Sequence, residues 1–203
     1  FKENWNDIIL SVSIAFAAFL AVAVATANFF HYKHEDSPRA IWLNLAIGFG
    51  LWALSEAVWC VYYFRLDFTE VPTPSLADIG WVVGYGFFAL AIYHQYVLIL
   101  PSLRNRIRNI IYGISAAVLI LPLVALLAMN TFTFENYINY FYSFADFAVG
   151  VAGLTLVLTF RGGMIARPWI GMVVFSVSDF LYAWATQTGI YAWAVENGNL
   201  LTM

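Results

Sequence analysis

Charged residues are scarce in this chain. Of its 203 residues only 10% are Asp, Glu, Lys or Arg, whereas 63% are hydrophobic. Soluble domains carry about 25% charged and about 45–50% apolar residues. The net charge of −3 is small, and no run of basic residues is present that would suit a nucleic acid. The composition therefore indicates an integral membrane protein whose main partner is the lipid bilayer, with no nucleic-acid partner.

Cysteine and catalytic motifs are scarce as well. The single cysteine, Cys60, excludes an internal disulfide framework and a multi-cysteine metal site. The sequence contains no His-Glu-x-x-His motif, no phosphate-binding loop and no Cys-x-x-Cys pair. His31 and His34 lie one turn apart beside Glu35 and Asp36, and we interpret them as a solvated cluster rather than metal ligands. We expect no enzyme and no metal site, and no motif names a cofactor.

Long apolar runs dominate what is present. Each run has 20 or more residues, which at ~1.5 Å per residue is enough to cross a hydrocarbon layer of ~30 Å. The sequence therefore predicts an all-α fold, a polytopic transmembrane helical bundle that forms one domain over 1–203. We expect the spans at 8–31, 40–64, 76–100, 109–129, 137–160 and 168–190.

The basic residues predict the orientation of the bundle. Lysine and arginine concentrate in the cytoplasmic loops of membrane proteins. In this chain they gather in the predicted loops after the first, third and fifth spans, and only Lys2 and Arg65 fall on the other side. We therefore expect the amino terminus to lie outside the cytoplasm. The basic residues of the three loops are Lys33, Arg39, Arg104, Arg106, Arg108, Arg161 and Arg167.

Three acidic residues lie inside the predicted spans, namely Glu56, Asp146 and Asp179. Helical rise places all three at a similar depth, roughly 12–16 Å below the outer surface. An ionisable group in the hydrocarbon core costs roughly 2.5–3.5 kcal/mol on insertion scales, so such residues usually face the bundle interior and serve a function. We expect them to line one cavity that is open to the outside.

Two explanations compete for these acids. In the first they are protonated or hydrogen-bonded to Tyr and Ser side chains and only hold helices together. In the second they bind a small ligand, a cation or a proton. Interhelical hydrogen bonds in membranes average only ~0.6 kcal/mol, so stability is a weak reason to bury three carboxyl groups. We therefore favour the second explanation.

The spans that contain Glu56 and Asp179 share a pattern. A serine precedes each acid, and an aromatic residue follows three positions later, so each set occupies one helix face. This similarity indicates an internal duplication, with repeat units 1–130 and 131–203, the second incomplete. We accordingly expect the chain to be a fragment of a seven- or eight-span protein. The matched neighbours are Ser55 and Trp59 in one span and Ser178 and Tyr182 in the other.

Asp78 is a further acid, at the outer start of the third span. Ser75 precedes it by three residues, the spacing of a capping box at a helix N-terminus. That role alone explains Asp78. Trp81 nevertheless continues the same helix face, so both residues also remain candidates for lining the pocket.

The stretch Pro74-Ser75-Leu76-Ala77-Asp78-Ile79-Gly80-Trp81, followed by Gly84-Tyr85, resembles a motif of multi-span sensor regions in bacteria and archaea. Those regions precede diguanylate cyclase (GGDEF) or histidine kinase output domains. The resemblance covers chiefly 48–96, with a weaker echo at 171–203. It implies a sensory input module in a prokaryotic plasma membrane, with a cytoplasmic output domain in the full-length chain. The 203 residues contain no such domain, which departs from the family pattern.

Three functions remain open at this point. We favour a sensory, receptor-like module with an outward-facing acidic and aromatic pocket. The alternative is an accessory subunit of a respiratory or photosynthetic membrane complex, which would contact lipid, quinone, pigment or other membrane subunits. A transporter is a third reading, because acids at one depth can relay protons or cations.

Overall fold

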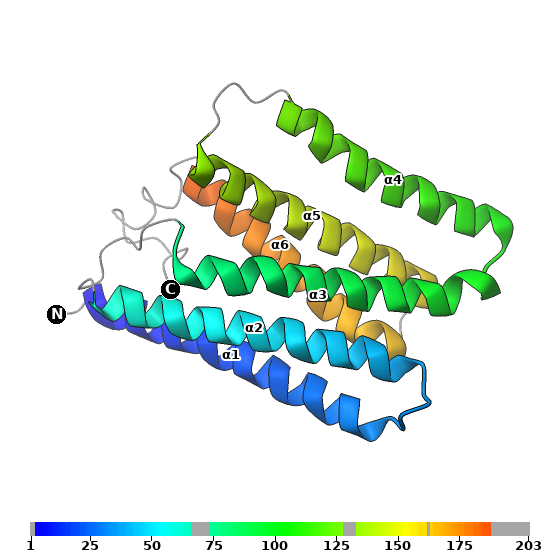
Figure 1. The fold of residues 1–203 in the computed structure, drawn as a ribbon, viewed down its shortest axis with the longest axis horizontal. Helices are drawn as coiled ribbons and strands as arrows, with labels where there is room; N and C mark the ends of the chain where they lie inside the picture. The colour runs from blue at the N-terminus through cyan, green and yellow to red at the C-terminus, as the bar shows by residue number, and fades with distance from the viewer. Residues whose placement is uncertain (1–2, 66–73, 128–132, 162, 188–203) are drawn as a thin grey trace. The chain divides into compact units, whose positions relative to one another are not determined.

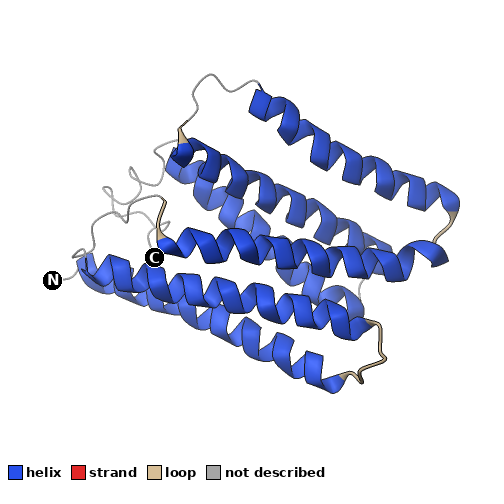
Figure 2. Ribbon diagram, viewed as in Figure 1, coloured by secondary structure: helices blue, strands red, loops and turns tan. Residues whose placement is uncertain are grey.

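The computed structural model describes residues 3–65, 74–127, 133–161 and 163–187. Within these residues the chain is helical and forms no strand, as Figure 2 shows. The all-α class predicted from composition and hydropathy is therefore confirmed. Six long helices correspond to the six predicted spans, and their bounds are α1 (Glu3–His31), α2 (Pro38–Arg65), α3 (Leu76–Ile99), α4 (Asn105–Leu127), α5 (Phe134–Phe160) and α6 (Arg167–Gln187).

Local sequence signals explain where the helices begin and end. Pro38 opens α2, a position at which the missing N–H costs no helical hydrogen bond. Thr133 caps α5 by accepting a hydrogen bond from the backbone N–H of Asn136 at 3.2 Å. Beyond α5, Arg161 adopts the left-handed conformation and Gly163 has a φ of 84°, so the chain turns away before α6. The predicted span ends at 129 and 190 lie outside the described residues.

Four of these helices are long and apolar enough to cross a membrane within the part of the chain that the structure describes. The protein is therefore a membrane protein with transmembrane helices. Whether α4 and α6 also span the bilayer stays a prediction. The four qualifying segments are Val12–His31, Pro38–Tyr62, Leu76–Ser102 and Phe134–Phe160.

The chain forms two compact units, with the division between Leu98 and Ile99. In the first unit α1 packs along α2, and α3 lies against the other side of α2 (Figure 1). In the second unit α5 and α6 are closely paired, while α4 contacts α5 much less. The prediction of a single domain over 1–203 stays a prediction.

Glycines set the spacing of the helix pairs. A Cβ atom at Gly84 of α3 would lie 3.2 Å from the carbonyl oxygen of Gly48 in α2, and one at Gly48 would lie 3.3 Å from the carbonyl oxygen of Gly84. These distances are shorter than ordinary contacts, so only glycine permits the observed approach. Lipid is as apolar as the helix surfaces, and close van der Waals packing of this kind is what holds membrane helices together.

Candidate functional site

Glu56 lies in the C-terminal half of α2 and is partly buried. The side chains of Trp81 and Trp52 lie close enough to its carboxyl group to interact with it. Trp52 stands one turn earlier on α2, whereas Trp81 comes from α3. An indole N–H can only donate, and a carboxylate can only accept, so the groups are chemically matched. Glu56 therefore has indole neighbours from two helices of the same unit.

The two tryptophans belong to a larger aromatic cluster, which we define as Trp52, Trp81, Tyr85 and Phe88. The Trp52 ring is centred 6.3 Å from Trp81 and 5.2 Å from Tyr85, and its contact with Tyr85 is edge-to-face. Phe88 completes the cluster at 6.1 Å from both Trp52 and Tyr85. Rings at these separations attract one another beyond their burial. The cluster therefore fixes the side chains that surround Glu56.

Ser55, the residue before Glu56, packs against α3. It is buried, and a Cβ atom added at Gly80 would collide with its hydroxyl group. Ser55 therefore lies at the α2–α3 contact and helps to set the distance between the helices. Trp59, one turn beyond Glu56, is half-buried.

Asp78 forms the capping box that the sequence predicts. Its Oδ2 atom accepts hydrogen bonds from the Ser75 backbone N–H at 2.5 Å and from the Ser75 hydroxyl at 3.0 Å. The side chain is only 6% exposed. Ser55 of α2 meets Gly80 of α3. Glu56 follows Ser55 directly, so it is level with the first turns of α3, where Asp78 lies. The first unit therefore places two acids at one level.

In the second unit Asp146 of α5 is only 3% exposed, and Asp179 of α6 is half-buried. The small residues that follow Asp146 face α6, as the sequence suggests: a Cβ atom at Gly150 would lie 3.2 Å from Cβ of Ser176. Ser178 and Tyr182 are exposed. The Ser178 hydroxyl donates to the carbonyl oxygen of Val174 at 2.9 Å, within its own helix.

The acids divide between the two units. Glu56 and Asp78 belong to the first, and Asp146 and Asp179 to the second. Each unit by itself brings two carboxyl groups to neighbouring positions on packed helices. A common cavity for Glu56, Asp146 and Asp179 stays a prediction.

Sequence reasoning missed two contributors. Trp52 shares a helix face with Glu56, but its interaction with the carboxyl group arises together with Trp81 of another helix. Ser176 has no acid beside it in the sequence, and only its position opposite Gly150 draws attention to it. A comparison of the small-residue faces of the fifth and sixth spans would have been the signal for Ser176.

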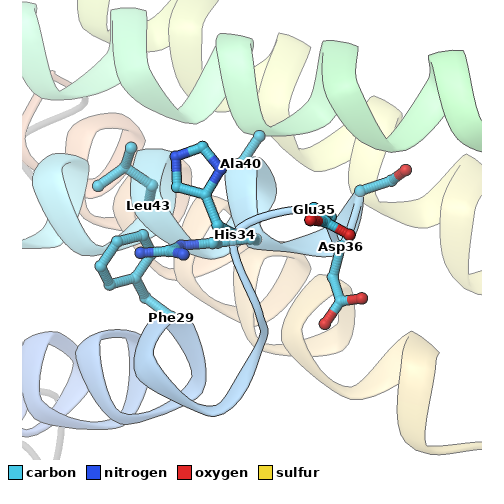
Figure 3. Close-up of a pocket in the computed structure, with 8 residues that line it drawn as sticks. Phe29, His34, Glu35, Asp36, Ala40 and Leu43 are labelled. Atoms are coloured by element: carbon cyan, nitrogen blue, oxygen red, sulfur yellow. The ribbon is translucent and has the colours of Figure 1, made fainter.

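A separate polar hollow lies where α1 meets α2. Its volume is about 410 Å³, and it is open to the surroundings (Figure 3). Arg39 stacks over the Phe29 ring at 4.5 Å from its centre, and Asp36 accepts a hydrogen bond from the Lys33 backbone N–H at 2.7 Å. His34 is exposed, and the described residues contain no cluster of three or more acidic, histidine or cysteine side chains suited to a metal. The hollow has the character of a solvated loop surface.

Comparison of the chain with protein-family models, curated proteins and solved structures gives no match. The resemblance to sensor regions thus stays a prediction, and the argument for function depends on the geometry of the acidic and aromatic residues.

Proposed function

We propose that the chain is a membrane-embedded sensory module that binds a small cation, a related ligand or a proton through its buried acids. The observation that carries the proposal is the environment of Glu56, a carboxyl group inside an apolar helix with two indole side chains beside it. An acid at this depth is expensive unless it serves a purpose. Aromatic rings attract cations and a carboxylate neutralises their charge, so a site that contains both suits an organic cation.

The close α2–α3 contact offers a way to report binding. Gly48, Gly80 and Gly84 bring the two helices together, and Glu56 with Trp81 bridges them near one end. A cation that neutralises the carboxyl group would weaken its hold on the indoles and favour a different packing of the pair. Ligands act in this way when their affinity differs between two packings. The cytoplasmic ends of the helices would carry the change to an output domain in a longer chain.

The proposal includes a topology. The six helices cross a prokaryotic plasma membrane, the amino terminus lies outside, and the acids open toward the outer side. The distribution of Lys and Arg supports this orientation. Asp146 and Asp179 then form a second site of similar chemistry.

Titration of tryptophan fluorescence tests the proposal. The purified chain in lipid nanodiscs would be titrated with tetramethylammonium chloride and, separately, with acid. We expect a saturable change in fluorescence, because Trp52 and Trp81 contact the acid. Glu56→Gln should abolish the change and leave the protein folded, and in a common pocket Asp179→Asn should do the same. Glu135→Gln, the same substitution at an exposed position, is the matched control. Titration curves that Glu56→Gln leaves unchanged would refute the site.

The exposed apolar faces favour a second candidate, an accessory subunit of a larger membrane complex. Large apolar side chains are exposed along α1 and α4, for example Phe16 at 69% and Leu127 at 78%. Lipid can cover such faces. A partner subunit, a quinone or a pigment would also bind to a face of this kind. Purification from the native membrane in mild detergent separates the two: a coloured or multi-subunit preparation supports the subunit, and a colourless chain with its own output domain supports the sensor.

A further inference from the structure

The contact between α5 and α6 is close enough to bring side chains of both helices to one point. A Cβ atom at Gly150 would lie 3.2 Å from Ser176 Cβ, and one at Gly153 would lie 3.1 Å from a methyl group of Val173. The partner numbers fall as the α5 numbers rise, so the helices run antiparallel. These two contacts fix their register.

The register places Asp146 and Asp179 at the same level. Asp146 is one turn before Gly150 on α5, and Asp179 is nearly one turn after Ser176 on α6. In antiparallel helices both steps lead in the same direction along the pair, and both turn toward the same side of the contact. The two carboxyl groups therefore lie beside each other at the α5–α6 contact, one turn beyond the Gly150–Ser176 contact.

Ser176 supplies an independent observation. It is 2% exposed, and among the described residues its hydroxyl oxygen has no hydrogen-bond partner. Other hydroxyl groups of these helices donate to the carbonyl oxygen four residues earlier, as Thr155, Thr159 and Ser178 do. A buried hydroxyl without a partner costs free energy. Along the helix pair, Ser176 stands about one turn from the level of Asp146 and Asp179.

We infer that Asp146, Asp179 and Ser176 form a binding site for a small monovalent cation, with sodium as the reference ion. Neighbouring carboxylates in apolar surroundings repel each other, and a cation between them removes that repulsion. Carboxylate and hydroxyl oxygens suit hard cations. Calcium takes six to eight oxygen ligands and magnesium keeps several waters, and two carboxyl groups with one hydroxyl group supply fewer oxygens than calcium takes. The inference rests on the proposed function only in naming the ligand class for the acids of α5 and α6.

Thermal unfolding of the full chain tests the inference. The unfolding midpoint would be measured in detergent micelles at fixed pH and ionic strength, while sodium chloride replaces choline chloride. A cation that binds only the folded state raises the midpoint saturably. Ser176→Ala should raise the sodium concentration required by at least about tenfold, the loss that removing even an outer-shell partner causes at a metal site. Asp146→Asn should remove the sodium effect.

Controls separate the possible results. Ser178→Ala removes a hydroxyl that is already bonded within α6, so it should keep the parent response. If Asp146→Asn fails to fold, the sodium titration of Ser176→Ala decides the question by itself. This substitution removes only one oxygen atom. A midpoint that responds to pH but not to sodium, or an unchanged sodium titration in Ser176→Ala, overturns the inference. Glu56→Gln should keep the sodium effect and lose the tetramethylammonium response. If it loses both responses, the sodium site is not separate from Glu56 and the inference is overturned. If it keeps both responses, only the proposed function is refuted.

Discussion

Acidic side chains in this protein serve different purposes because their neighbours differ. Asp78 accepts from the backbone and side chain of Ser75, so its oxygen satisfies the start of α3. Glu56 interacts with the indole group of Trp52, one turn earlier on its own helix, and with that of Trp81 on α3. The first interaction depends only on residues three apart in the chain, and the second depends on how α2 meets α3. A buried acid is therefore informative only together with the groups around it.

The capping role of Asp78 predicts a loss of stability without a loss of ligand response. Asp78→Ala removes both hydrogen bonds at the start of α3 and should destabilise the protein by about 0.5–2 kcal/mol, the usual cost of a lost cap. Hydrogen exchange should accelerate in the first turn of α3. Glu35→Ala, at an exposed acid, is the control. Loss of the tetramethylammonium response in Asp78→Ala, with stability unchanged, would instead assign Asp78 to the binding site.

Glycine-lined contacts determine how the helices pair. Gly80 and Gly84 of α3 face α2, and Gly150 and Gly153 of α5 face α6. In the first pair Glu56 directly follows Ser55, which meets Gly80, and in the second pair Asp146 lies one turn from Gly150. Small residues let the backbones come near, and this nearness is what brings side chains of two helices to a common point. The same packing that stabilises each pair therefore also builds its candidate site.

Two glycines of α3 provide a matched comparison. Gly84→Ala would place a Cβ atom 3.2 Å from the Gly48 carbonyl oxygen, which is backbone and cannot rotate away. We expect a cost of about 1–3 kcal/mol from overpacking. Gly86 has no atom within 4 Å of its added Cβ, so Gly86→Ala should be neutral or stabilising by about 0.4–1 kcal/mol. Denaturant titration of both variants measures the difference, and equal stabilities would contradict the close α2–α3 contact.

The arrangement of the chain as a whole follows from its contact with lipid. Side chains of α1 and α4 are mostly apolar and exposed, and the bilayer is the solvent that accepts such faces. Along the sequence, most of the basic residues lie in the α1–α2 and α3–α4 connections and around the start of α6. This distribution is the basis of the proposed orientation.

Cysteine labelling tests that orientation. In a Cys60→Ala background, Ser37→Cys and Glu135→Cys place single thiols at exposed positions, one between α1 and α2 and the other at the start of α5. We expect a membrane-impermeant maleimide to label Glu135→Cys in intact cells and Ser37→Cys only after permeabilisation. The reverse pattern would place the amino terminus in the cytoplasm and the acids on the inner side.

Much of the fold could be predicted from the sequence because it depends on local signals. Apolar runs of membrane-spanning length identified every helix, and Ser75 with Asp78 marked the start of α3. These features involve residues within a few turns of one another, so hydropathy and spacing are sufficient to identify them.

Only the tertiary structure revealed which side chains meet. The interaction of Glu56 with Trp81, and the contact of Ser176 with Gly150, join residues that lie far apart in the chain. Such meetings depend on the register of one helix against another. That register is decided by atomic contacts such as Gly48 against Gly84 and Gly150 against Ser176. Hydrophobic periodicity shows that a helix has a buried face, but it does not distinguish one turn of the partner helix from the next.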